Sequence, residues 1–333
     1  MEAEEIYEAL GGAAGCRRLA EAFYARVPKD RLLRPLFPSG SLRCAIGEFA
    51  AFLIQFLGGP PEHSQSRWWL SLRESHGRFR IGVAERDAWM RLMSATIEDL
   101  RAPDALRELF ERASLYLIDR ESGSGGGLAE SGLAEKWNAQ LALDAAVTAI
   151  KAGDAERAIA LAPNCNRTVR SGLLARMIRS GHPALIEYAH DQIRANPKLV
   201  HERFAGRTLL HDAAASGHSE TVRLLLEAGA DPKSQDGGCH TPLYSVANEC
   251  RSGGADTVRI LVSAGANVNA ADGVQRCTPL HMAARRGNAS IALELLECGA
   301  NIAARDRRGD TPLRRALNCK KREVAELLAA RGA

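Results

Sequence analysis

The stretch TPLHMAA at residues 278–284 decides how the second half of this 333-residue chain folds. Related stretches open at Thr208, Thr241 and Thr311, so the four openings are 33, 37 and 33 residues apart. A threonine can cap the amino end of a helix, a proline is accepted in the first turn, and the leucine enters a core. Glycines at positions 229, 265 and 299 supply a left-handed stop after a second helix. The period therefore predicts a stack of similar helical units.

These units resemble ankyrin repeats, a motif of high specificity. One unit cannot bury its own apolar face, so neighbours stack into an α-solenoid with a concave surface. The resemblance implies an ankyrin-repeat domain at 134–333 with about six repeats, the first two of them degenerate, near 142–154 and 172–182. It also implies a protein partner, of unknown identity, on the concave face. We expect His211 and His281 to be structural residues whose rings bond backbone between units, not ligands or bases.

A stretch rich in glycine and serine at 121–133 precedes the repeats. This composition is typical of a flexible linker. No Gly-x-Gly-x-x-Gly spacing follows a strand here, so a phosphate-binding loop is excluded. Residues 1–120 are therefore expected to form a domain of their own.

Apolar side chains in that first domain recur at helical spacing. They form four stripes, separated by glycine and proline turns, at Leu19, Phe23 and Val27; Phe49, Phe52, Leu53 and Phe56; Trp89, Met93, Ile97 and Leu100; and Leu106, Phe110, Ala113 and Leu117. The stripes predict amphipathic helices, so we expect the whole chain to be all-α.

His76 is one of two histidines before residue 123, and it stands three residues before Phe79, between two apolar stripes. A neutral imidazole beside an aromatic ring is what the proximal side of a haem iron needs. Taken alone, the pattern also fits an ordinary core or surface histidine. The neighbouring sequence is needed to distinguish a haem ligand from an ordinary histidine.

Several ordered motifs make this domain resemble the truncated haemoglobins, specifically the second group of these bacterial-like globins. The motifs are Leu10-Gly11-Gly12, Phe23-Tyr24, Leu36-Phe37-Pro38, the run from Phe52 to Pro60, the run from His76 to Ile81, and the run from Glu85 to Trp89. The resemblance spans about residues 5–119. It implies a truncated globin domain, two helices packed on two, within residues 1–120, and haem b as its cofactor.

The resemblance assigns His76 as the iron ligand, Tyr24 and Trp89 as hydrogen-bond donors on the opposite, distal side, and Phe37 as a packing partner of the porphyrin. Ala45 stands where many globins keep a distal histidine, and Phe49 adds bulk without a polar group. For Tyr24 and Trp89, a place in a helical core is the plainer alternative. The full set of expected haem-binding residues is His76, Tyr24, Phe37, Ala45, Phe49, Phe52, Arg67, Phe79 and Trp89.

Three departures from the family pattern bear on how the haem would be held. Trp68-Trp69 and Glu74-Ser75 replace residue pairs that relatives often carry, and Glu48 sits where a basic side chain would meet a propionate. Arg67 and His63 are then the remaining candidate anchors, and each is equally well a plain solvated residue. The two tryptophans could cover the pocket entrance, or contact another domain or a second copy of the chain.

The function that these resemblances imply is binding of dioxygen, or of nitric oxide or carbon monoxide, at haem iron, coupled to the repeats as in a haem-based sensor. We favour ligand binding over catalysis, because solenoids of this type seldom catalyse. Two alternatives stay open: a haem-free adaptor, and a haem oxidoreductase acting as a nitric oxide dioxygenase or peroxidase. The oxidoreductase would need an external reductase, since no flavin or nicotinamide motif is present.

Composition and charge limit the kinds of binding partner and the cellular location that we expect. The chain is 46% hydrophobic and 25% charged with a net charge of +4, and no dense basic stripe favours nucleic acid. No apolar run is long enough to cross a membrane, and the acidic start is unlike a secretory signal. The eight cysteines lack zinc-site spacing and are expected to be reduced. We therefore expect a cytoplasmic protein that binds neither nucleic acid nor membrane, with its oligomeric state left open.

Overall fold

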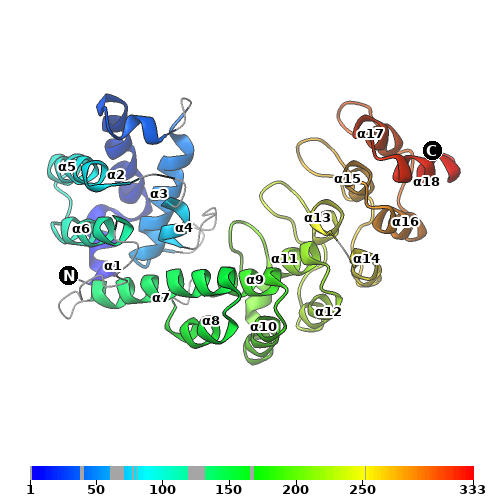
Figure 1. Ribbon diagram of the computed structural model, residues 1–333, viewed down its shortest axis with the longest axis horizontal. Helices are drawn as coiled ribbons and strands as arrows, with labels where there is room; N and C mark the ends of the chain where they lie inside the picture. The colour runs from blue at the N-terminus through cyan, green and yellow to red at the C-terminus, as the bar shows by residue number, and fades with distance from the viewer. Residues whose placement is uncertain are drawn as a thin grey trace. The chain divides into compact units, whose positions relative to one another are not determined.

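The computed structural model describes residues 2–37, 41–60, 71–76, 79, 81–118, 132–165, 169–251 and 253–333. These residues form helices and no β-strand, which confirms the all-α prediction. Contacts divide the chain into two compact units, Met1–Arg170 and Ser171–Ala333 (Figure 1). Within the described ranges, no helix combines the length and apolar character that a membrane crossing requires.

The first unit is built from helices of very different length. They are α1 (Ala3–Leu10), α2 (Gly12–Arg26), α3 (Arg43–Phe56), α4 (Leu72–His76), α5 (Val83–Asp99), α6 (Ala105–Ile118), α7 (Gly132–Ala152) and α8 (Ala155–Leu161), with short 3-10 turns η1 (Val27–Lys29), η2 (Arg34–Leu36) and η4 (Ala162–Asn164). Among the helices of the globin resemblance, α2 packs on α3, α5 packs on α6, and α2 also contacts α5. Two helix pairs therefore face each other, as the globin resemblance implied.

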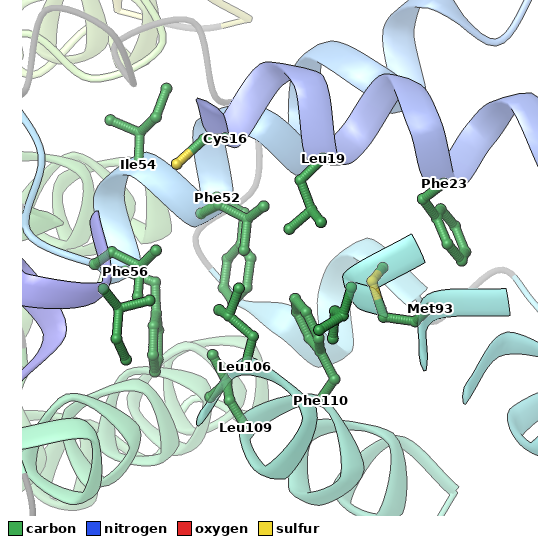
Figure 2. Close-up of a cluster of buried hydrophobic side chains, with 14 of the residues drawn as sticks. Cys16, Leu19, Phe23, Phe52, Ile54, Phe56, Met93, Leu106, Leu109 and Phe110 are labelled. Carbon is green, nitrogen blue, oxygen red and sulfur yellow. The ribbon is translucent and has the colours of Figure 1, made fainter. Parts of the chain in front are cut away.

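The core of this unit is made by the apolar stripes that the sequence showed. Side chains from α2, α3, α5 and α6 converge in Figure 2, among them Leu19, Phe52, Met93 and Phe110. Burial of such side chains contributes about 1.5–3 kcal/mol each before entropy is subtracted. Leu100 departs from its stripe and is 41% exposed, because α5 ends at Asp99 and Leu100 is its C-cap.

Two glycines make close packing between the first helices possible. Gly11 joins α1 to α2 with φ of 90°, a left-handed conformation that side chains rarely adopt. Gly59 follows α3 and lies against the Tyr7 ring, where a Cβ atom would stand 2.6 Å from Tyr7 Cε2. The end of α3 therefore packs directly on α1.

Helix α7 also belongs to this first unit, although the sequence pattern placed residues from 134 onward with the repeats. Its Trp137 is 1% exposed and lies in the same core. Lys136 pairs with Glu4 of α1 at 3.0 Å. Of the expected linker at 121–133, only Gly132 and Leu133 are described, and they begin α7.

The second unit consists of helix pairs in two rows (Figure 1). Its helices are α9 (Arg170–Ser180), α10 (Pro183–Ala195), α11 (Leu209–Ser216), α12 (Ser219–Glu227), α13 (Pro242–Glu249), α14 (Gly254–Ser263), α15 (Pro279–Arg286), α16 (Ala289–Glu297), α17 (Pro312–Asn318) and α18 (Arg322–Ala330), with a 3-10 turn η6 (Pro197–His201). In one row α11, α13, α15 and α17 pack in succession, and in the other α12, α14, α16 and α18 do so. This is the ankyrin-type stacking that the period predicted.

The repeat openings begin helices and bond to the next unit, as the sequence suggested. Thr241 Oγ1 accepts a hydrogen bond from the Tyr244 backbone N–H at 3.2 Å and so caps α13. His211 Nε2 donates to the His240 carbonyl at 3.0 Å, and His281 Nε2 donates to the Asp310 carbonyl at 3.0 Å. Both histidines thus join one unit to the next, and their expected structural role is confirmed.

Candidate functional site

His76 ends the short helix α4, and its ring is oriented by the helix itself. Its Nδ1 lies 2.9 Å from the Leu72 carbonyl and 2.8 Å from Ser75 Oγ. Because a carbonyl can only accept, Nδ1 carries the proton in the first of these bonds, and in the neutral ring Nε2 is then the basic nitrogen. Metal-bound histidines commonly donate their other ring N–H to a backbone carbonyl in this way. The ring is therefore prepared to ligate through Nε2.

From His76, a continuous series of aromatic rings leads to α2. The ring centroids of His76 and Phe79 are 6.3 Å apart, those of Phe79 and Phe37 5.9 Å, and those of Phe37 and Tyr24 5.5 Å. These separations fall within the range in which aromatic side chains interact favourably. The proximal candidate and one distal candidate are thus joined by ring contacts.

Phe49 of α3 extends the series to α5. Its ring centroid lies 6.3 Å from that of Tyr24 and 6.3 Å from that of Trp89. Phe110 of α6 closes the group, at 5.9 Å from Phe49 and 5.4 Å from Trp89. We call the six rings of His76, Phe79, Phe37, Tyr24, Phe49 and Trp89 the aromatic series.

Tyr24 is half-buried, and its ring packs against those of Phe23, Phe37 and Phe49. Burial raises the pKa of Tyr24 well above its ordinary value of 10.0. A phenol with the ordinary tyrosine pKa is already protonated at physiological pH, and the shift acts in the same direction. A protonated hydroxyl is a hydrogen-bond donor, which is the property that the distal assignment requires.

The segment that carries Phe37 is anchored by Asp30. The Asp30 carboxylate accepts hydrogen bonds from the Leu32 and Leu33 backbone N–H groups at 2.9 and 3.0 Å and pairs with Arg91 of α5 at 2.7 Å. These bonds, above all the one from the Leu33 N–H, hold the pKa of Asp30 below its usual value. The turn that leads to Phe37 is therefore tied to α5 through Asp30 and Arg91.

The other expected haem-binding residues lie in different surroundings. Ala45 is half-buried on α3. Phe52 is buried in the helical core, where its ring lies 5.5 Å from that of Phe56 (Figure 2). Arg67 lies outside the described residues, as do His63, Trp68 and Trp69.

Two residues near this site escaped the sequence analysis as functional candidates. Phe110 was assigned to an apolar stripe, and nothing in the sequence showed that it meets Trp89. Asp144 of α7 accepts a hydrogen bond from the Leu72 backbone N–H at 2.9 Å, at the amino end of α4. Its signal was available: a carboxylate stands inside the apolar run from Leu141 to Val147.

The residues present fit a haem. Within the described ranges, no group of three or more His, Cys, Asp or Glu side chains gathers as a metal site. A haem brings four ring nitrogens to its iron and needs only one proximal side chain from the protein, together with an apolar surround. His76 with its oriented ring, and the aromatic series beside it, are of that kind.

Comparison with known proteins matches each unit to a family. Residues 5–114 match the bacterial-like globin family, residues 205–237 match a single ankyrin repeat, and residues 245–333 match a set of three ankyrin repeats. The Group 2 truncated hemoglobin YjbI of Bacillus subtilis (strain 168) is 36% identical over 110 residues, which are 33% of this chain and 82% of that protein.

Other similar proteins share only a small part of their length. The potassium channel SKOR of Arabidopsis thaliana is 37% identical over 121 residues, 36% of this chain and 10% of the channel. The ankyrin repeat and SOCS box protein 3 of Bos taurus is 44% identical over 110 residues, 33% of this chain and 20% of that protein. The chain therefore belongs to the bacterial-like globin family, as a group 2 truncated haemoglobin that continues into ankyrin repeats.

Proposed function

We propose that this chain binds haem b through His76 and takes up a diatomic gas on the side that Tyr24 and Trp89 line. The globin family implies a haem cofactor, and globins bind diatomic gases. Bound haem would supply an iron atom with an open coordination position for dioxygen, nitric oxide or carbon monoxide. His76 would hold that iron from α4, and the phenylalanines of the aromatic series would pack against the porphyrin.

The observation that carries this proposal is the aromatic series itself. It brings residues of α2, α3, α4 and α5 into continuous ring contact, with an oriented imidazole at one end and an indole at the other. A helical core could contain such rings for packing alone. It would not need the His76 ring to be fixed through Nδ1, which favours ligation.

Tyr24 and Trp89 would serve as donors toward the gas. A diatomic ligand that gains negative charge in an apolar site is stabilised by O–H and N–H groups aimed at it. Each hydrogen bond to a charged group contributes about 1.5–3 kcal/mol. A tyrosine hydroxyl keeps its proton at physiological pH, and burial, which raises the pKa of Tyr24, reinforces this. The indole N–H of Trp89 can only donate.

The second unit would hold a protein partner. Ankyrin repeats mediate protein interactions, and five helix pairs from α9 to α18 are described in this unit. We place the partner on the concave face, which we assign to the row formed by α11, α13, α15 and α17. Ligand state at the haem would then alter how the repeats bind, so that the chain acts as a sensor.

Hemin titration of the full-length chain tests the haem proposal. We expect saturation at one hemin per chain with an intense Soret band, and a shift of that band when the reduced protein takes up carbon monoxide. A chain that gives no saturable band would contradict haem binding and leave a haem-free adaptor.

Sensing needs a separate measurement. Amide hydrogen exchange of residues 171–333 should differ between the reduced protein with and without carbon monoxide. Identical exchange in both forms would remove sensing from the proposal and leave haem binding intact.

A further inference from the structure

Helix α7 lies outside the segment that matches the globin family, because that match ends at residue 114 and α7 begins at Gly132. It nevertheless packs against α4, the helix that carries His76. We propose that Asp144 of α7 is a positioning residue for His76: it fixes the backbone of Leu72, and Leu72 in turn orients the His76 ring. This inference rests on the proposed ligation of haem by His76.

Asp144 is built into the contact between the two helices. Its side chain is buried, with 1% of the residue exposed, and its Oδ1 accepts hydrogen bonds from the Leu72 N–H at 2.9 Å and from Gln140 Nε2 at 2.8 Å. A buried carboxylate is costly unless donors surround it, so these bonds keep it in place. Asp144 therefore holds one specific backbone group of α4.

That group is one of the unpaired N–H groups at the start of a helix. Ser71 Oγ accepts from the Glu74 N–H at 3.1 Å, which caps α4 from within. The Leu72 N–H has its partner on α7 instead. The amino end of α4 is thus completed by a helix that the globin segment does not contain.

Leu72 connects Asp144 to the candidate iron ligand. Its N–H donates to Asp144, and its carbonyl accepts from His76 Nδ1 at 2.9 Å and from Ser75 Oγ at 2.8 Å. A displacement of the Leu72 backbone would move the acceptor that orients the His76 ring. Groups that hydrogen-bond a metal-bound imidazole fix its orientation and raise its basicity, so the effect would reach the iron.

A second contact links the same two helices. Lys151 Nζ, on the penultimate residue of α7, lies 2.8 Å from the carboxylate of Glu74, whose side chain is 9% exposed. A helix as short as α4 is not stable by itself in water. The two contacts with α7 therefore contribute to the position of α4 as a whole, and α7 is the segment that leads from the globin helices toward the repeats.

Two substitutions of Asp144 and one matched control test this inference in the full-length, hemin-loaded chain. Asp144→Ala removes the acceptor for Leu72. Asp144→Asn keeps an acceptor oxygen without the charge, and a neutral hydrogen bond is about half as strong. Glu135→Ala removes an exposed carboxylate from the same helix. The readouts are the iron–histidine stretching band of the reduced protein in resonance Raman spectra and the rate of hemin transfer to an acceptor globin.

We expect Asp144→Ala to move the iron–histidine band and to accelerate hemin loss about tenfold, the lower end of the effects known for partners of metal ligands. Asp144→Asn should give a smaller displacement of the band, and Glu135→Ala none. In the haem-free chain, amide exchange at residues 72–76 should be faster in Asp144→Ala than in Glu135→Ala.

A folded Asp144→Ala protein with the band, hemin loss and α4 exchange of the parent would overturn the inference. If that variant does not fold, Asp144→Asn decides, since a displaced band supports positioning and an unchanged band refutes it. A parent chain without any iron–histidine band would refute the haem proposal itself, and this inference with it. A band that is present but insensitive to Asp144 would refute this inference alone.

Discussion

Trp137 of α7 packs edge-on against Tyr116 of α6, with ring centroids 5.7 Å apart and an interplanar angle of 85°. This contact places a helix from beyond the globin match inside the core of the first unit. Replacing Trp137 by alanine would leave a large cavity there. We therefore expect Trp137→Ala to lower the free energy of unfolding of the first unit by about 3–5 kcal/mol, as measured by urea denaturation.

Leu115→Ala is the matched control, because Leu115 lies on α6 next to Tyr116 and is 49% exposed. Exposed substitutions of this kind change stability by no more than about 0.5 kcal/mol. Equal effects of the two substitutions would show that α7 contributes nothing to this core.

Ligand release should depend on the two distal donors. In the haem-loaded protein, Tyr24→Phe and Trp89→Phe each remove one donor worth about 1.5–3 kcal/mol. Release of dioxygen, followed by stopped-flow absorption, should therefore become roughly ten- to a hundredfold faster for each variant. Tyr188→Phe in α10 should leave the rate unchanged. If both distal variants released dioxygen at the rate of the parent, Tyr24 and Trp89 would contribute packing but no hydrogen bond to the ligand.

The stability of the repeats should fall on mild acidification because of His211. Burial lowers the pKa of His211 from 6.5 to about 4. Below pH 6.5 the unfolded chain takes up a proton at this residue that the folded chain does not, so unfolding is favoured as the pH drops toward 4. From pH 7 to pH 5 we expect a loss of about 2 kcal/mol from this residue.

The comparison of His211→Gln with His201→Gln checks this expectation, because His201 is exposed. The free energy of unfolding of the repeats should depend less steeply on pH in the first variant than in the second. The same slope in both would assign the pH dependence to other groups.

The last repeat contains a buried ion pair whose disruption should be costly. Asp306 accepts hydrogen bonds from the Arg308 and Asp310 N–H groups at 2.8 and 3.0 Å and from Arg315 Nε at 2.7 Å, and its side chain is 0% exposed. Arg315→Met would leave that carboxylate without its cation. We expect a loss of about 3–5 kcal/mol in unfolding free energy, measured by denaturation.

Arg322→Met provides the contrast, since Arg322 pairs with Glu326 at the surface with its side chain 91% exposed. Exposed pairs contribute little to stability. If the two variants were equally stable, burial of Asp306 would have no energetic consequence.

Most of the fold could be predicted from the sequence because its signals are local. The Thr-Pro-Leu openings specify helix starts, and Thr241 and His281 act in the structure as that pattern requires. The globin stripes likewise bury Leu19 and Phe23. Stripe ends are less well specified, which is why Leu100 was expected inside and lies at a helix end.

The association of α7 with the globin helices could not be predicted in the same way. The alanine- and leucine-rich sequence before Gly153 resembles the first helix of a repeat, and nothing local shows where Trp137 will pack. The contact of Asp144 joins residues 72 positions apart. A single carboxylate in an apolar helix indicates that a buried hydrogen-bond donor lies nearby. Which donor this is depends on the tertiary structure.

The candidate site, too, could be predicted from the sequence only in part. Family motifs predicted His76, Tyr24, Phe37 and Trp89, and the structure brings them into one aromatic series. The assignment of these residues to a haem remains a prediction, as does the anchoring role of Arg67.

Hemin binding by His76→Ala tests the central claim most directly, measured by absorption titration beside the parent and His201→Ala. We predict that His76→Ala alone loses the parent's saturable Soret band, and that imidazole added to the solution restores it by replacing the missing ligand. A His76→Ala protein that binds hemin with the parent's spectrum and affinity would contradict the account.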